Sequence, residues 1–165
     1  MSNARRLSGL TMSLVSAGVT AGTNATFNQA TTSRCVIGGK FAVGLAAGNG
    51  QTSPTTDVNT GAAFLPMVDD EICVFVWGVI AAGTIAVAQG SIESTLVGAT
   101  TTPGTVVVNP QFPALPDNFC PIAYTVVKTA PSSSGFTFGT TTWATSGIDD
   151  VWVDIATLPD RPQNA

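Results

Sequence analysis

Residues Ile72–Ala88 read ICVFVWGVIAAGTIAVA and hold no charged side chain over seventeen positions. The first half of this run is rich in β-branched and aromatic residues, which favour a strand. A turn is indicated at Ala81-Ala82-Gly83, and the apolar run resumes at Ile85. We therefore predict a β-hairpin and no membrane-spanning helix, although the length of the run alone would allow such a helix.

The first strand of this hairpin carries apolar side chains on both of its faces. A strand of this kind is covered on both sides, at the centre of a sheet, between two sheets or at a subunit interface. Alternation places Cys73, Phe75, Trp77 and Val79 on one face, and Val74, Val76 and Ile80 on the other.

The rest of the chain is typical of short strands separated by turns rich in Gly, Pro and Thr. We expect a loop over 48–61, and an extended or irregular segment over 110–116, where three prolines cannot donate to a sheet. The pattern predicts an all-β fold, an antiparallel β-sandwich or a barrel-like domain. Further strands are expected over 34–46 (with a bulge at Gly38-Gly39), 92–102, 105–109, 122–129, 136–138, 140–145 and 151–156.

The 165 residues indicate one domain with an extension at each end. We assign residues 1–25 to an N-terminal arm or short helix, because Leu7, Leu10 and Leu14 repeat at helix-like spacing. Residues 26–165 form the β domain, which ends in an extended, Pro-rich tail over 157–165. A secretion signal is an open alternative for the N-terminus, but polar residues and glycines interrupt its apolar run.

Charged residues make up only 10% of the chain, and the formal net charge is −4. The six basic residues are scattered, so no patch that would neutralise phosphates is present and nucleic acid is not an expected partner. Free monomers usually carry more surface charge to remain soluble. The composition therefore favours a surface that is covered by copies of the same chain or by another protein.

Elimination leaves little chemistry for catalysis. The chain contains no histidine, which excludes Ser-His-Asp and Cys-His systems and histidine-based metal sites. We predict that the protein is not an enzyme and has no cofactor, no metal site and no catalytic residue. A hydrolase that uses two carboxylates, or a calcium site, stays open as an alternative. The acidic residues available for these are Asp69, Asp70, Glu71, Asp149, Asp150 and Asp154.

Two further residue types are informative. Cys35, Cys73 and Cys120 have no metal-binding spacing, so we interpret them as buried, reduced thiols; one disulfide with one remaining thiol is the alternative. Trp143 lies in the Thr-rich segment GTTTWATSG (139–147), where we predict an exposed side chain that could recognise a ligand such as a glycan.

The segment from residue 40 to residue 163 resembles a group of small structural proteins of tailed bacteriophages. The resemblance covers about three quarters of the chain and consists of short motifs. These motifs are Gly39–Ala42, Pro54–Asp57, Thr60–Phe64, Gln89-Gly90, Pro110–Asp117, Pro121–Tyr124 and Thr157–Pro162.

This resemblance implies a capsid decoration (cement) protein or a head or tail accessory protein. Such a protein would be made in the host cytoplasm and located in the virion, on the capsid surface. Its partners would be the major capsid protein and copies of itself, as a homotrimer on local three-fold positions, with no membrane partner. The candidate contact residues are Arg5, Arg6, Leu7, Leu10, Leu14, Leu158 and Arg161.

Two other functions remain open on the sequence. A head- or tail-fibre module that binds host-surface glycans would use Trp143 and the loop over 48–61. A secreted, adhesin-like bacterial domain would require cleavage of a signal within the N-terminal residues.

Overall fold

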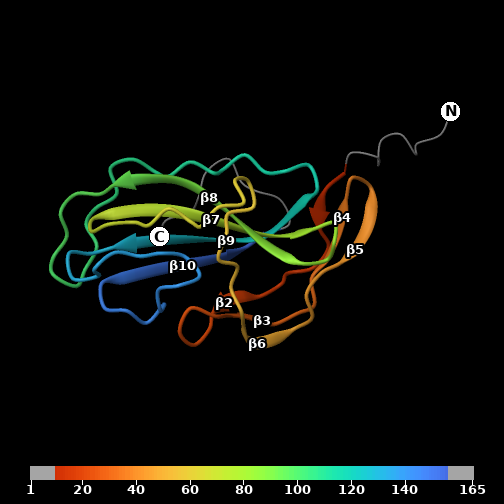
Figure 1. Cartoon of the computed structure of the whole chain (residues 1–165), viewed down its shortest axis with the longest axis horizontal. Helices are drawn as coiled ribbons and strands as arrows, with labels where there is room; N and C mark the ends of the chain where they lie inside the picture. Colours follow the sequence, from red (N-terminus) through yellow and green to blue (C-terminus); the bar gives the residue numbers. More distant parts are fainter. Residues whose placement is uncertain (1–9, 156–165) are drawn as a thin grey trace.

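The computed structural model describes residues 10–155, and over this range the chain is all-β, without a helix (Figure 1). Three antiparallel sheets have the strand orders β1-β4-β5, β10-β9-β7-β8 and β2-β3-β6. The predicted all-β, sandwich-like class is confirmed. The strands are β1 (Met12–Ser13), β2 (Val19–Ala21), β3 (Phe27–Gln29), β4 (Arg34–Ile37), β5 (Lys40–Val43), β6 (Gly48–Gln51), β7 (Glu71–Ile80), β8 (Ile85–Ser94), β9 (Phe119–Thr129) and β10 (Ile148–Asp154).

The four-stranded sheet is built around the predicted hairpin, which β7 and β8 form. Its turn closes where the N–H of Gly83 donates to the carbonyl of Ile80 at 2.8 Å. Gly83 has a φ of 82°, a left-handed conformation that glycine adopts without a steric cost. The other edge of β7 pairs with β9, and β10 continues the sheet beyond β9. The two longest buried runs of the sequence therefore lie side by side.

One face of this sheet packs against a layer of aromatic rings. The ring of Trp77 lies 4.9 Å from that of Phe27 and 5.2 Å from that of Phe138, measured between centroids. The indole N–H of Trp77 donates to the hydroxyl of Thr125 at 2.8 Å, so its polar atom is satisfied inside the core. The buried aromatic residues of this layer are Phe27, Phe64, Phe75, Trp77, Phe136, Phe138 and Trp143.

The opposite face of the sheet is covered mainly by the long connection between β8 and β9. Phe112, from the Pro-rich part of that connection, packs edge-on against Tyr124, with ring centroids 5.2 Å apart. Val106 and Leu115 pack on the same face. Both faces of β7 are therefore buried, as the sequence pattern predicts. Of the predicted alternatives, β7 lies at the centre of a sheet, between two covering layers.

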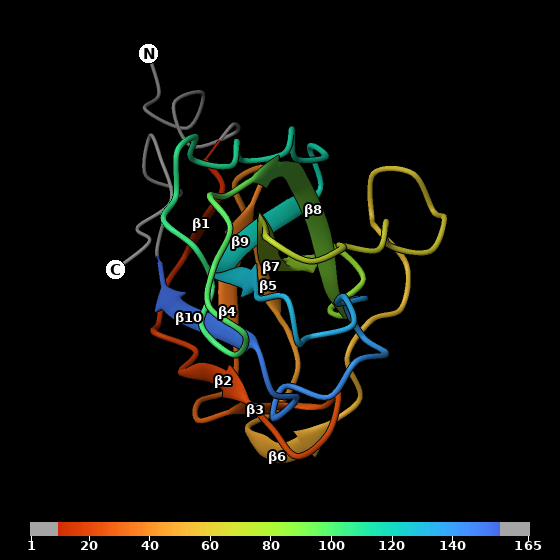
Figure 2. The same cartoon turned by 90° about the vertical axis from the view of Figure 1, so that its left-hand side faces the viewer.

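The segment 34–46 forms a hairpin of two strands, so the prediction of one strand with a bulge is wrong. Gly38 and Gly39 have φ values of 56° and 80°, which is the pattern of a two-residue turn with two left-handed positions. The turn reverses the chain and pairs β4 with β5. The hairpin stands at one end of the long strands, whereas β2, β3 and β6 lie together below the central sheet (Figures 1 and 2).

The described part of the N-terminal segment is not helical. Residues 12–25, which the sequence analysis assigned to an arm, contribute β1 and β2 to the domain. Ala17 and Val19 are buried in the main core. Leu10 and Leu14 therefore do not belong to a helix, and residues before position 26 contribute strands to the β domain.

Three of the predicted short strands, over 105–109, 136–138 and 140–145, are reduced or absent. Val106 and Phe136 form only isolated bridges, and residues 140–145 form turns. Thr141 explains why residues 140–145 form turns. Its hydroxyl accepts from the N–H of Thr137 at 2.9 Å, and its own N–H donates to the carbonyl of Thr137. Such local bonds compete with strand pairing.

Gly78 provides a test of the close packing between β7 and β9. A Cβ at Gly78 would lie 2.4 Å from the ring of Phe119 and 2.6 Å from the carbonyl oxygen of Cys120. We expect Gly78→Ala to lower the free energy of unfolding by about 1–3 kcal/mol, measured by urea denaturation. Gly48→Ala in β6 is the control, since its Cβ would meet only the movable amide of Gln51. Equal stability of the two variants would contradict this packing.

Candidate functional site

The small sheet β1-β4-β5 turns one face to the core and one face to solvent. Ser13 and Cys35 are cross-strand partners on the inner face, where both are buried, and Ile37 is buried on the same side. Because side chains alternate along a strand, the residues between them point outward. Two rows of side chains point outward. One row contains Met12, Val36 and Phe41, and the other contains Leu14, Arg34 and Val43.

The outward rows form an apolar surface, which we name the outer face (Met12, Leu14, Arg34, Val36, Phe41 and Val43). Phe41 is 62% exposed, Val43 is 52% exposed and Leu14 is 47% exposed. Leu10 lies beside this sheet, since its carbonyl accepts from the N–H of Gly39 in the β4–β5 turn. Neighbouring large apolar side chains left in water are typical of a protein interaction site.

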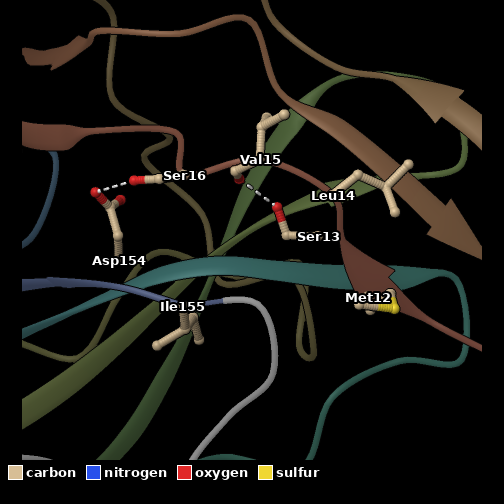
Figure 3. Close-up of a pocket in the computed structure, with 7 residues that line it drawn as sticks. All are labelled: Met12, Ser13, Leu14, Val15, Ser16, Asp154 and Ile155. Carbon is tan, nitrogen blue, oxygen red and sulfur yellow. Dashed lines mark hydrogen bonds between the residues drawn. The ribbon is translucent and has the colours of Figure 1, made fainter.

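A groove of about 450 Å³ runs between β1 and the end of β10 (Figure 3). Asp154 holds its two walls together, because its carboxylate accepts from the hydroxyl of Ser16 and from the N–H of Gly18, both at 3.0 Å. A third bond comes from the N–H of Val19 at 3.2 Å. Leu14 lines the groove as well as the outer face, so the two features are continuous.

The structure brings only part of the predicted contact set together. Leu14 lies on the outer face and Leu10 lies beside it. Five others lie outside the described residues: Arg5, Arg6, Leu7, Leu158 and Arg161. Phe41 and Val43 were missed as site residues because their alternation was interpreted within one long strand. The signal that could have identified them is the Gly38-Gly39 pair, which predicts a hairpin turn.

The prediction that Trp143 is an exposed recognition residue is wrong. Its side chain is 5% exposed and packs against Phe136 and Trp152, with centroids 5.2 and 5.0 Å away. Its indole N–H donates to the carbonyl of Thr26 at 2.8 Å. The polar neighbours of Trp143 in the sequence form the surrounding turns, while the ring itself fills the aromatic layer.

The acidic side chains considered for catalysis or calcium binding hold loops and strand ends in place. Within residues 10–155, no group of three or more potential metal ligands occurs. The contacts are Asp69 with the hydroxyl of Ser133 (3.2 Å), Asp70 with the N–H of Gly98 (2.8 Å), Glu71 with the N–H of Val68 (2.7 Å), Asp149 with the ammonium of Lys128 (2.8 Å), Asp150 with the indole N–H of Trp152, and Asp154 with the bonds above.

The surroundings of Asp150 shift the pKa of its carboxyl. Burial raises the pKa of its carboxyl above the usual value, and the negative charge of Asp149 acts in the same direction. The hydrogen bond from Trp152 opposes the change in pKa. The charged form of Asp150 is therefore held at a cost in the folded protein.

Comparisons with protein-family models, with curated proteins and with solved structures gave no match. Over residues 10–155 the structure has no helix that could cross a membrane. The candidate site is an apolar outer face with one arginine, continuous with a groove.

Trp143 and Phe41 allow a direct comparison of a buried and an exposed aromatic side chain. We expect Trp143→Ala to lower the free energy of unfolding by about 3–5 kcal/mol, because it empties part of the aromatic layer. Phe41→Ala removes a ring that is mostly in water, so a change of about 0.5 kcal/mol or less is expected. Denaturant titration measures both values, and a smaller loss for Trp143→Ala than for Phe41→Ala would refute the placement.

Asp150 also predicts a pH dependence. Its folded pKa lies above its unfolded pKa, so the folded state binds more protons between the two values and stability falls as the pH rises through that window. Asp150→Asn removes the charge and keeps an acceptor for Trp152. We expect its Tm at pH 7 to equal or exceed that of the wild type, with the difference closing towards about pH 4.

Asp149→Asn is the matched control for this pH experiment, because it removes a neighbouring charge that is exposed and paired with Lys128. Loss of that pair lowers stability, while removal of the charge that repels Asp150 acts in the opposite direction, so no net gain in Tm is expected at neutral pH. A Tm of Asp150→Asn below that of Asp149→Asn at pH 7 would count against a costly charge at Asp150.

Proposed function

We propose that this protein is a structural component of a tailed-bacteriophage particle, a decoration protein that docks on the assembled shell. The observation that carries the proposal is the outer face, where Phe41 and Val43 are exposed on β5 and Leu14 is exposed across β4 from them. The occupant that we propose for this face is the major capsid protein. The resemblance of the sequence motifs to phage structural proteins supports the same assignment.

Apolar burial would supply the binding energy. Complete burial of one Val, Leu or Phe side chain contributes roughly 1.5–3 kcal/mol. Arg34, which lies within the outer face, would add direction through a carboxylate on the shell. A protein that binds the assembled shell and not its free subunits stabilises the shell by mass action.

Self-association would strengthen weak individual contacts. In the proposed homotrimer, three outer faces would engage neighbouring capsid subunits at a local three-fold position. The second and third contacts then become intramolecular, which raises the total affinity without a new kind of contact. The low charge of the chain, 10% of its residues, supports a surface that is covered in the assembly.

The chemistry of the described residues supports binding without catalysis. Hydrogen bonds and one ion pair within the fold engage the carboxylates of Asp69, Asp70, Glu71, Asp149, Asp150 and Asp154. We therefore propose a role that needs no cofactor and no metal, with recognition through shape and apolar contact.

Quantitative mass spectrometry of purified particles of the source phage tests the assignment. We expect copy numbers of this chain comparable to those of the major shell protein. A small ratio would instead indicate a vertex, fibre or tail component and would favour receptor binding. Complete absence from the particles would refute the structural role.

The outer face itself is tested by adding purified variants back to particles that lack the protein. We expect Phe41→Ser combined with Val43→Ser to weaken binding at least tenfold, on the order of the loss of two apolar contacts. The control is Val97→Ser combined with Val107→Ser, which changes two other exposed valines, 82% and 64% exposed. Both double variants should keep the wild-type Tm, and equal binding by both would reject the outer face as the docking surface.

A further inference from the structure

A β-bulge interrupts the pairing of β3 with β6, which is an edge strand of the β2-β3-β6 sheet (Figure 1). At the bulge, two residues of β6, Asn49 and Gly50, lie opposite one residue of β3, Asn28. Gly50 has a φ of 65°, a left-handed conformation that glycine supplies at bulges. Asn49 and Gly50 are both exposed. The bulge therefore presents an Asn-Gly pair to solvent.

An Asn-Gly pair can change its own chemistry in water. The backbone nitrogen of the glycine loses its proton and attacks the side-chain Cγ of the asparagine, so that an N–C bond forms and ammonia leaves. Water then opens the resulting five-membered imide at one of its two carbonyls, which gives aspartate or isoaspartate. Glycine favours the attack because no side chain shields its nitrogen. Asn49-Gly50 is the only Asn-Gly pair in the sequence.

The bulge also has room for the imide ring and for the water that opens it. Apart from its chain neighbours, no atom of the described residues would lie within 4 Å of a Cβ placed on Gly50. The strand β6 pairs with β3 along one edge only. Ring formation at Asn49 therefore needs a local opening at the sheet edge and no unfolding of the core.

The side-chain amide of Asn28 holds the nitrogen that would attack. The N–H of Gly50 donates to Oδ1 of Asn28 at 2.9 Å. The Nδ2 of Asn28 donates to the carbonyl of Ala21, on the neighbouring strand β2, at 2.8 Å. Both ends of the amide are thus fixed, and its acceptor is kept in front of the N–H of Gly50. The nitrogen is free to attack only after this hydrogen bond has opened.

We propose that Asn49 is a site of spontaneous deamidation, and that Asn28 sets the rate by holding the N–H of Gly50. The reaction converts one neutral amide to one carboxylate, so the formal net charge changes from −4 to −5. The isoaspartate product also adds one methylene to the backbone of β6 within the bulge. The modification is independent of the proposed docking role of the outer face.

Asn59 is the internal reference, because it is also exposed and lies in the connection that follows β6. Its Nδ2 donates to the carbonyl of Ala114 at 2.9 Å, which restrains the side chain. The next residue, Thr60, has a β-branched side chain beside its nitrogen, and its N–H donates to the carboxylate of Asp57 at 3.1 Å. We therefore expect Asn59 to keep its amide while Asn49 is converted.

The test incubates the full folded chain in mildly alkaline buffer, which promotes loss of the amide proton. The buffer is made with isotopically labelled water, because the new carboxylate oxygen comes from the solvent, and each asparagine is followed by peptide mapping with mass spectrometry. We expect labelled aspartate and isoaspartate at Asn49 and an unchanged amide at Asn59. No conversion of Asn49, or equal conversion at both positions, would overturn the assignment of the site.

Two variants of Asn28 test its control of the rate. Asn28→Asp keeps an acceptor for the N–H of Gly50, Asn28→Ala removes it, and both lose the donor to Ala21. We expect Asn49 to convert about fivefold faster in Asn28→Ala than in Asn28→Asp, the factor that one net hydrogen bond supplies. Equal rates in the two variants would refute the role of Asn28.

The wild type supplies a second measurement, which is needed if Asn28→Ala fails to fold. Denaturant releases the N–H of Gly50 from Asn28, so Asn49 should convert faster in denaturant than in buffer at the same pH. Equal rates under the two conditions would contradict protection of this nitrogen by the fold.

Discussion

Both faces of β7 must be kept from water, and the protein meets this requirement with two different layers. Residues Ile72 to Val79 are all buried, which is possible only because β8 and β9 occupy both edges of the strand. Aromatic rings cover one face, and the Pro-rich connection between β8 and β9 covers the other. The removal of this apolar surface from water is the main favourable contribution to folding.

The arrangement around β7 explains why some exposed apolar residues lie on the small sheet. Others lie in the connections before β7 and after β8, namely Leu65, Val68, Leu96, Val97, Val107 and Val108. The aromatic layer uses rings from distant segments, among them Phe27, Phe64 and Trp143, and Phe41 is not part of it. A three-stranded sheet at the end of the long strands can bury only one of its faces against the core. Its other face is therefore free to carry Phe41, Val43 and Leu14, and a partner would have to cover them.

The small sheet is attached to the rest of the molecule by a few well-defined contacts. Asp154 binds the β1–β2 connection to the end of β10, and Gly44 allows the hairpin to approach Val79 closely. Such contacts set the orientation of the outer face relative to the core. Asp70 and Glu71 act in a similar way to Asp154, because each accepts a hydrogen bond from a backbone N–H at a loop or strand end.

The sequence by itself determined the fold class, the hairpin of β7 and β8, and the strand that becomes β9, because apolar alternation and a Gly-containing turn are local signals. The Gly38-Gly39 pair was a local signal that 34–46 folds back on itself, but local patterns could not show that Leu10 and Leu14 lie outside a helix or that Trp143 is buried. The candidate site was half predicted: its leucines were named, and Phe41 and Val43 were not. Only the tertiary structure decided which apolar side chains entered the core and which stayed outside, because burial depends on pairings between segments far apart in the chain.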